Sequence, residues 1–212
     1  MSRVVIQGDA SGTGDFTIAA PNSNTDRTLT LPDEAGTVLT TSSTSVVTPA
    51  MLTQPLTSGT TVATTSGTSV DFTGIPSWVK HITIMVKDFS TNGASHCYLR
   101  IGSGSVATSG YLSAGGYLHS AGGSGITSTT TGFMLNNNIA ASVVIHCIAR
   151  LSLLDSSTNS WTFSSSGNRS DFAGLIFGSG STSLGGALDR VRLTTANGTD
   201  TFDAGLINIV YE

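Results

Sequence analysis

Apolar and polar residues alternate along many short stretches of this 212-residue chain. Between residues 80 and 89, Ile82, Ile84 and Val86 share one face of the alternation, while His81, Thr83, Met85 and Lys87 share the other. Alternation with a period of two predicts a strand with one buried face. No stretch keeps a helical period over a useful length, and the predicted fold class is therefore all-β.

From residue 67 onward the pattern is that of a complete β domain. Turn residues separate apolar stretches about every ten residues, which predicts about eight strands in a sandwich of jelly-roll type. The longest alternation, 142–154, is expected to form a central strand, and 126–135 another strand. Asn92-Gly93 and Asn197-Gly198 are typical of tight hairpin turns.

The first 48 residues show a different organisation. Two short alternating runs, around 16–18 and 29–31, flank a turn-rich patch. They predict a hairpin whose apolar face consists of Phe16, Ile18, Leu29 and Leu31. An isolated hairpin is marginal in water, so this face needs copies of itself or a partner surface. We therefore divide the chain into an assembly region (1–48), a linker (49–66) and a β-sandwich (67–212).

The composition excludes several classes of function. Only 10% of the residues are charged and the net charge is −4, so the chain lacks the basic stripe of a nucleic-acid binder. Arg190 and Arg192 are close in sequence, but their alternate positions favour a solvated strand face. With 38% hydrophobic residues the chain is not of the disordered type. No apolar run is long enough for a membrane-spanning helix, and the start is too short for a signal peptide.

The two cysteines each follow a histidine, in His96-Cys97 and His146-Cys147. Neighbours on a strand point to opposite faces, which argues against one metal ion bound by such a pair. The alternation places both cysteines in phase with apolar residues and both histidines on the other side. We interpret Cys97 and Cys147 as buried free thiols, with a disulfide or a metal site as the alternatives.

No motif predicts catalysis, a cofactor or a metal. The acidic residues mostly adjoin Gly, Asn or Pro, where aspartate caps turns. The glycine-rich 102–105 stretch lacks the lysine and the helix of a phosphate loop. Tyr111, Tyr117 and His119 stand among glycines and form a candidate surface-contact loop, because aromatic rings bind partners at small entropic cost. The alternative is that the two tyrosines cap the core.

Several segments together resemble the fibre proteins of tailed bacteriophages and prophages. At the N-terminus these are GTGDFTI (12–18), RTLTLPD (27–33) and GTVLT (36–40). Later they are VDFTGIPSWVK (70–80), LDRVRLTT (188–195) and NGTDTFDAG (197–205). Together these segments comprise 47 of the 212 residues. They follow one another in the order of the family, and they are specific only as a set.

The resemblance implies a non-enzymatic virion protein, assembled in the cytoplasm of a bacterial host. It implies a homotrimer whose N-terminal region docks on other virion proteins, in the tail, baseplate or capsid. The C-terminal knob would contact a host-surface glycan or protein. One alternative is a capsid decoration protein, and a less favoured one is a polysaccharide depolymerase, which would release sugar from host capsule.

Removal of residues 1–57 tests the prediction that the N-terminal region provides the association and that the C-terminal domain folds without it. We expect the remaining domain to stay folded but to associate weakly, because the apolar face that needs partners has been removed. Light scattering on the full chain and on the truncated chain measures this difference. A truncated chain as firmly associated as the full one would contradict the prediction.

Overall fold

The computed structural model describes residues 11–13, 24–26, 28, 54–137, 140–141, 143–171 and 173–212. The chain divides into two units, Met1–Val46 and Val47–Glu212. The strands described below all belong to the second unit. The predicted assembly residues Phe16, Ile18, Leu29 and Leu31 lie outside the described residues.

The described part of the chain contains fourteen strands and no helix. In chain order they are β1 (Thr57–Ser58), β2 (Val62–Ala63), β3 (Ser69–Thr73), β4 (His81–Thr91), β5 (Cys97–Ser103), β6 (Ser105–Val106), β7 (Leu112–His119), β8 (Ser124–Thr129), β9 (Phe133–Asn136), β10 (Ile145–Asp155), β11 (Ser160–Arg169), β12 (Gly174–Ser183), β13 (Arg190–Thr195) and β14 (Phe202–Tyr211).

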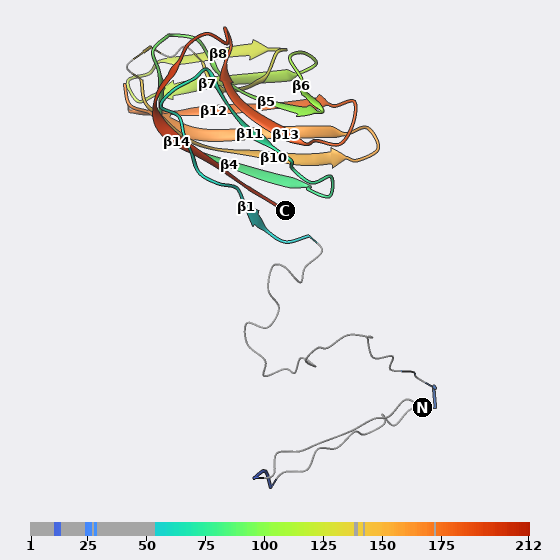
Figure 1. The fold of residues 1–212 in the computed structure, drawn as a ribbon. Coiled ribbons are helices and arrows are strands. Elements are labelled where there is room, and N and C mark those ends of the chain that lie inside the picture. The colour runs from blue at the N-terminus through green and yellow to red at the C-terminus, as the bar shows by residue number, and fades with distance from the viewer. Residues whose placement is uncertain are drawn as a thin grey trace. The chain divides into compact units, whose positions relative to one another are not determined.

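The strands form two antiparallel sheets that pack into a sandwich (Figure 1). The larger sheet has nine strands, in the order β1-β14-β4-β10-β11-β12-β7-β8, with β2 beside β14. The smaller sheet has five, in the order β3-β13-β5-β6, with β9 beside β5. The prediction of an all-β sandwich is confirmed, although the strands are shared unevenly between its two layers.

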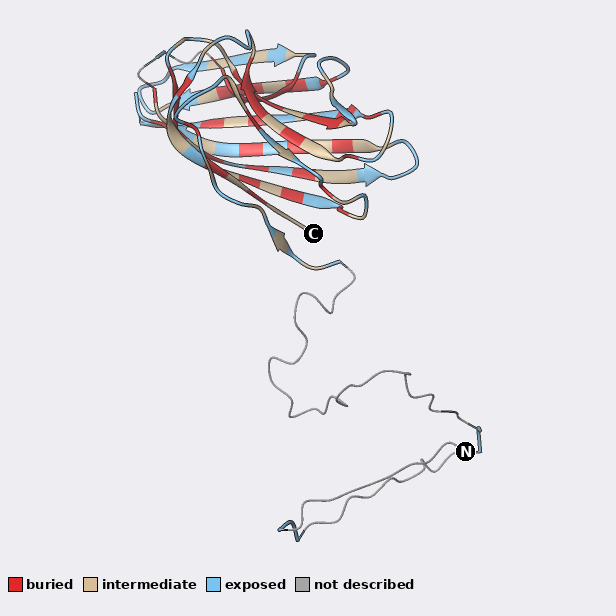
Figure 2. Ribbon diagram, in the orientation of Figure 1, coloured by how far each residue is buried: buried red, intermediate tan, exposed pale blue. Residues whose placement is uncertain are grey.

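The core lies between the sheets, and the alternation seen in the sequence produces it. On β10, Ile145, Cys147, Ala149 and Leu151 are buried, while the residues at the alternate positions are intermediate or exposed (Figure 2). β10 lies between β4 and β11, as expected for the longest alternation. Aromatic rings join the layers, since Phe133 of β9 stacks on Phe163 of β11 with centroids 4.6 Å apart.

Glycines in the larger sheet let β9 of the smaller sheet come into close contact with it. A Cβ on Gly178 of β12 would lie 2.1 Å from the carbonyl oxygen of Met134, and one on Gly115 of β7 would lie 2.5 Å from its side chain. The Met134 amide also donates a hydrogen bond to the buried Ser113 hydroxyl of β7, at 3.1 Å. These glycines therefore set how closely the layers approach at this point.

The two turns that were predicted to close hairpins instead connect one sheet to the other, and we call them the corners of the sandwich. Asn92-Gly93 leads from β4 in the larger sheet to β5 in the smaller one, and Asn197-Gly198 leads from β13 back to β14. The corners are hydrogen-bonded to each other, because the Ser95 amide donates to the Asp200 carboxylate at 2.9 Å. The dipeptide signal located the turns correctly, but it did not determine which strands pair.

Two further predictions need correction. The single strand expected over 126–135 is two strands in different sheets, β8 and β9, joined by a turn at 130–132. The expected linker 49–66 contains β1 and β2, which pair with β14. The sandwich therefore begins at Thr57 rather than at residue 67. A truncation that removes only residues 1–53 keeps these strands and makes the cleaner test of the assembly region.

The glycine contact with β9 predicts a large effect of one methyl group. We expect Gly178→Ala to lower the free energy of unfolding by about 1–3 kcal/mol or more, because the new Cβ meets a backbone oxygen that cannot move freely. Gly185→Ala is the matched control, since a Cβ there meets nothing within 4 Å, and its effect should stay within about 0.5 kcal/mol. Denaturant unfolding measures both, and equal effects would contradict the role given to Gly178.

Candidate functional site

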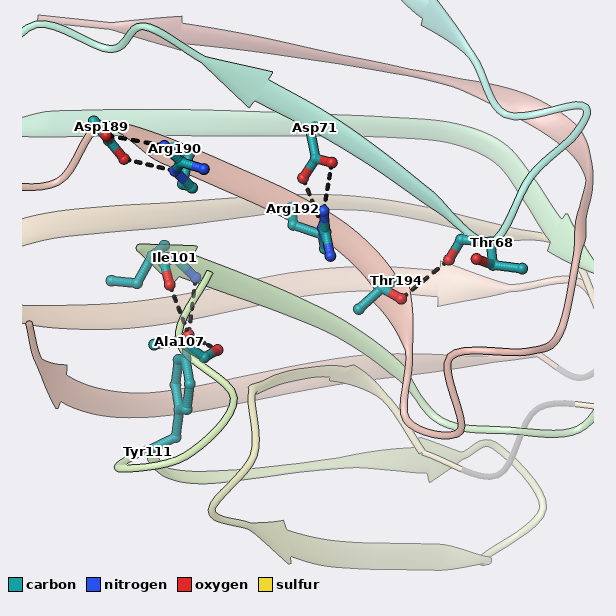
Figure 3. Close-up of polar contacts among 9 residues, drawn as sticks. All are labelled: Thr68, Asp71, Ile101, Ala107, Tyr111, Asp189, Arg190, Arg192 and Thr194. Atoms are coloured by element: carbon teal, nitrogen blue, oxygen red, sulfur yellow. Dashed lines mark hydrogen bonds and ion pairs between the residues drawn. The ribbon is translucent and has the colours of Figure 1, made fainter. Parts of the chain in front are cut away.

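Tyr111 lies in the core rather than on the surface, which corrects one part of the predicted contact loop. It is 2% exposed, and its ring packs edge-on against Phe133 at 4.9 Å between centroids. Its hydroxyl accepts a hydrogen bond from the Ile101 amide at 2.9 Å and lies 3.1 Å from the carbonyl oxygens of Ile101 and Ala107 (Figure 3). The alternative interpretation, a tyrosine that caps the core, is the correct one for this residue.

Tyr117 and His119 lie together near the end of β7, in a polar cluster that the sequence did not predict. The Arg169 guanidinium lies over the Tyr117 ring, with Cζ 5.8 Å from its centroid. Arg169 is 5% exposed and forms two hydrogen bonds of 2.6 Å with the Asp171 carboxylate. These bonds hold the pKa of Asp171 below its usual range. Arg169 stands between Asn168 and Ser170 in the sequence, a polar setting that does not predict its burial.

This polar cluster positions the loops at one end of the larger sheet. Arg169 ends β11, and its guanidinium also donates to the carbonyl oxygen of Asn137, at 3.2 Å, in the loop that follows β9. The His119 ring accepts a hydrogen bond from the Ala121 amide at 2.9 Å, within the β7–β8 turn. Removing one partner of a buried ion pair leaves an uncompensated charge. We call Arg169, Asp171 and the groups that they contact a structural clamp, because these contacts join the β11–β12 turn to the loop that follows β9. We therefore interpret Tyr117 and His119 as parts of this clamp rather than as freely projecting contact residues.

The two cysteines are free and buried, as predicted. Cys97 is 1% and Cys147 is 6% exposed, whereas His146 on the outer side of β10 and His96 just before β5 are less buried. Burial raises the pKa of Cys147 from 9.0 to about 12. Burial, and secondarily the charge of a Cys147 thiolate, raises the pKa of Cys97 well above 9.0. Both thiols are therefore protonated and unreactive near neutral pH.

The described residues contain no group of three His, Cys, Asp or Glu side chains that could hold a metal ion. Within the same part of the chain, no helix has the length and apolar character needed to cross a membrane. The two neighbouring arginines of β13 are each paired with a carboxylate (Figure 3). Arg192 binds Asp71 through two bonds of 2.7 Å, and Arg190 binds Asp189 at 2.8 and 3.1 Å. Their charges are thus balanced locally.

An open groove of about 700 Å³ lies on the outer face of the larger sheet, over β14, β4, β10 and β11. Outward-facing Met85, Ile148 and Asn208 stand side by side in the strand register and line it. Ile148 and Leu206 are 49% and 44% exposed, so the groove presents large apolar side chains to solvent. A sheet face that carries exposed apolar side chains is a candidate contact surface.

One end of this groove carries charge. Lys87 and His146 line it, and the Asp88 carboxylate lies 3.0 Å from the Lys87 ammonium and 3.4 Å from the His146 ring. Asp88 has a φ of 56°, at an irregular point of β4 where the register with β10 shifts. The groove thus combines apolar surface with a small polar end, an arrangement suited to non-covalent binding.

Sequence reasoning missed this groove because it treated the outward positions of each strand as solvated. Met85, Lys87 and His146 were recognised as the outer side of their strands, but nothing local in the sequence says that β14, β4 and β10 are neighbours. The available signal was the apolar character of Met85, Ile148 and Leu206 at outward positions.

Comparison with known proteins gives no relative from which a function could be transferred. No family model matches this chain, and no curated protein and no solved structure matches it significantly.

The buried thiols predict a loss of stability at alkaline pH. A pKa raised by folding means that the native state holds its proton more tightly than the unfolded state, so the stabilisation is complete below pH 9 and is lost as the pH rises from 9 toward 12. Each unit of pKa difference corresponds to about 1.4 kcal/mol. We expect Cys147→Ala to show a smaller decrease in the free energy of unfolding between pH 9 and pH 12, measured by urea unfolding. Identical pH dependence in the two proteins would contradict the assignment.

Proposed function

We propose that this chain is a non-enzymatic structural protein of a bacteriophage virion. In this proposal it forms a short homotrimeric fibre, with the N-terminal region associating and docking on the particle. The sandwich is the head that contacts a glycan or a protein of the host surface. The fibre-like motifs of the sequence support this proposal, together with the way in which the chain enters and leaves the sandwich.

The entry and exit of the sandwich are the observation that carries the proposal. β1 pairs with the last residues of β14, Thr57 opposite Tyr211, so the chain enters beside the point where it ends (Figure 1). The β7–β8 and β11–β12 turns lie at the opposite end of the larger sheet, since His119 pairs with Gly174 there. A head tethered at one end keeps its outer sheet face and its far loops free for a partner.

The groove supplies the contact surface of this head. It presents the apolar side chains of Met85, Ile148 and Leu206 beside the charged end formed by Lys87, Asp88 and His146. Apolar centres with a polar margin are typical of recognition surfaces. The residues that line the groove include no pair of facing carboxylates, which glycoside hydrolysis requires, so the groove fits an adhesive role better than a depolymerase.

Locating the protein on particles tests its place in the virion. Immunogold labelling of the phage that encodes this chain should place gold at the tail or baseplate. Label spread over the head would favour the capsid decoration protein, and particles without label would overturn the virion assignment.

The contribution of the groove to host contact is tested by substitution. We expect Ile148→Asp in the full chain to reduce binding to the host bacterium by at least about tenfold, the effect of about 1.4 kcal/mol, because it places a charge at the centre of the apolar surface. Leu154→Asp is the matched control on the same strand, since Leu154 is 71% exposed and outside the groove. Binding of fluorescently labelled protein to cells measures both, and equal binding would exclude the groove as the contact surface.

A further inference from the structure

β8 is an edge strand of the larger sheet. Its residues, Ser124–Thr129, pair with β7 in a regular antiparallel register, from Ser124 opposite Leu118 to Thr129 opposite Ser113. Among the described strands, none pairs with the other side of β8. Figure 2 shows the strand as exposed and intermediate along its whole length. Half of its backbone hydrogen-bonding groups therefore face away from the sheet.

The other edges of the sandwich carry features that discourage pairing, and β8 carries none of them. On the opposite edge of the same sheet, β14 is covered by β1 and β2, which are two residues long each. In the smaller sheet, β6 also has two residues, β3 carries Asp71, and β9 is buried and has an irregular register with β5. Natural edges are protected by shortness, charge, proline or bulges. The six residues of β8 read Ser-Gly-Ile-Thr-Ser-Thr, without charge or proline and in unbroken register.

An exposed apolar patch lies on the outer face of the larger sheet and reaches the β8 edge. It consists of Leu118, Ile126, Leu175 and Phe177, of which the first three are 54%, 72% and 61% exposed. Ile126 and Phe177 both stand opposite Gly116 in the register, and both would touch a Cβ placed there, at 3.1 and 3.2 Å. The side chains therefore meet across the glycine. We call these four residues the β8 patch. They place apolar surface beside the unpaired backbone groups of β8.

We propose that β8 is a self-association edge, at which two copies of this chain pair antiparallel about a two-fold axis. The larger sheets of both copies then form one continuous sheet, and the two β8 patches meet across the junction. Pairing supplies partners for the free backbone groups and covers Ile126 in the same step.

Two observations favour a second copy of this chain as the partner of β8. β8 has no charged residue, so the strand can face itself without repulsion between like charges. A ring of copies would need a second open edge in the same sheet, but β1 and β2 cover that edge. A single open edge leads to an isologous pair, in which the same strand contributes from both sides. This two-fold contact is separate from the trimer proposed for the N-terminal region.

The mass of the full chain in solution tests the pairing. Ile126→Lys puts a charge on the edge and in the patch, and we expect it to reduce the mass measured by light scattering at least twofold. If the N-terminal regions keep the chains single, a pair falls to one chain. If they hold the chains in threes, each trimer offers three β8 edges and linked trimers fall to one trimer, so failure of the trimer proposal does not change the direction of this result. Leu154→Lys, at an exposed leucine away from β8, should leave the mass unchanged. Equal masses for the unmodified chain and Ile126→Lys would overturn the proposal.

Cysteine cross-linking provides a second measurement that does not depend on a destabilising charge. The native thiols are buried, so a single introduced cysteine is the accessible one. We introduce the cysteine at one position of β8 at a time, in the variants Ser124→Cys, Ile126→Cys, Thr127→Cys and Ser128→Cys. In an antiparallel pair, a residue faces the same residue of the second copy only near the two-fold axis, so only that cysteine lies within disulfide distance of its counterpart. We expect one dominant cross-linked position and no cross-link for Leu154→Cys. Equal cross-linking at all four positions, or none above the Leu154→Cys level, would overturn the antiparallel pair.

Discussion

The close approach of the two sheets at β9 is the constraint on which the rest of the sandwich depends. Met134 reaches the larger sheet only because Gly115 and Gly178 present no side chain there. The same approach puts Phe133 between Tyr111 and Phe163, so three aromatic rings fill the adjacent core. Protein interiors are close-packed, and a change at one such contact is transmitted to its neighbours. The glycine-dense part of the sequence is therefore a packing surface rather than a flexible loop.

The corners of the sandwich depend on a second kind of contact. Each of the two Asn-Gly turns carries the chain from one sheet to the other, and the turns hold each other through Asn92, Ser95 and Asp200. A Cβ on Gly93 would fall within 2.1 Å of the Asp200 carboxylate, whereas Gly198 is needed for its φ of 68°. The same dipeptide thus serves two purposes: close packing at the first corner, and a left-handed backbone at the second.

The surface divides into regions with different uses. The chain enters the sandwich at the end where β1 meets β14, and the outer face of the larger sheet carries the groove. The β8 patch lies at the far edge of that same face. Exposed aliphatic side chains mark both places, while β11, which lies between β10 and β12, exposes Ser164, Ser166 and Asn168. The proposed host contact and the proposed self-association can therefore operate on one face without sharing residues.

The sequence by itself determined the class of fold and the inward side of most strands, because alternation records burial directly. It placed β4 and β10 correctly, and it identified Cys97 and Cys147 as buried thiols. It could not determine which strands are neighbours, because pairing depends on contacts between residues distant in sequence. Tyr111 shows the difference: its glycine-rich setting suggested exposure, but the Ile101 and Ala107 backbone groups that bind its hydroxyl belong to the opposite layer and its connection. The groove and the open edge of β8 likewise exist only once the strand order is known, since both are formed by neighbouring strands and by the absence of a paired strand among the described ones.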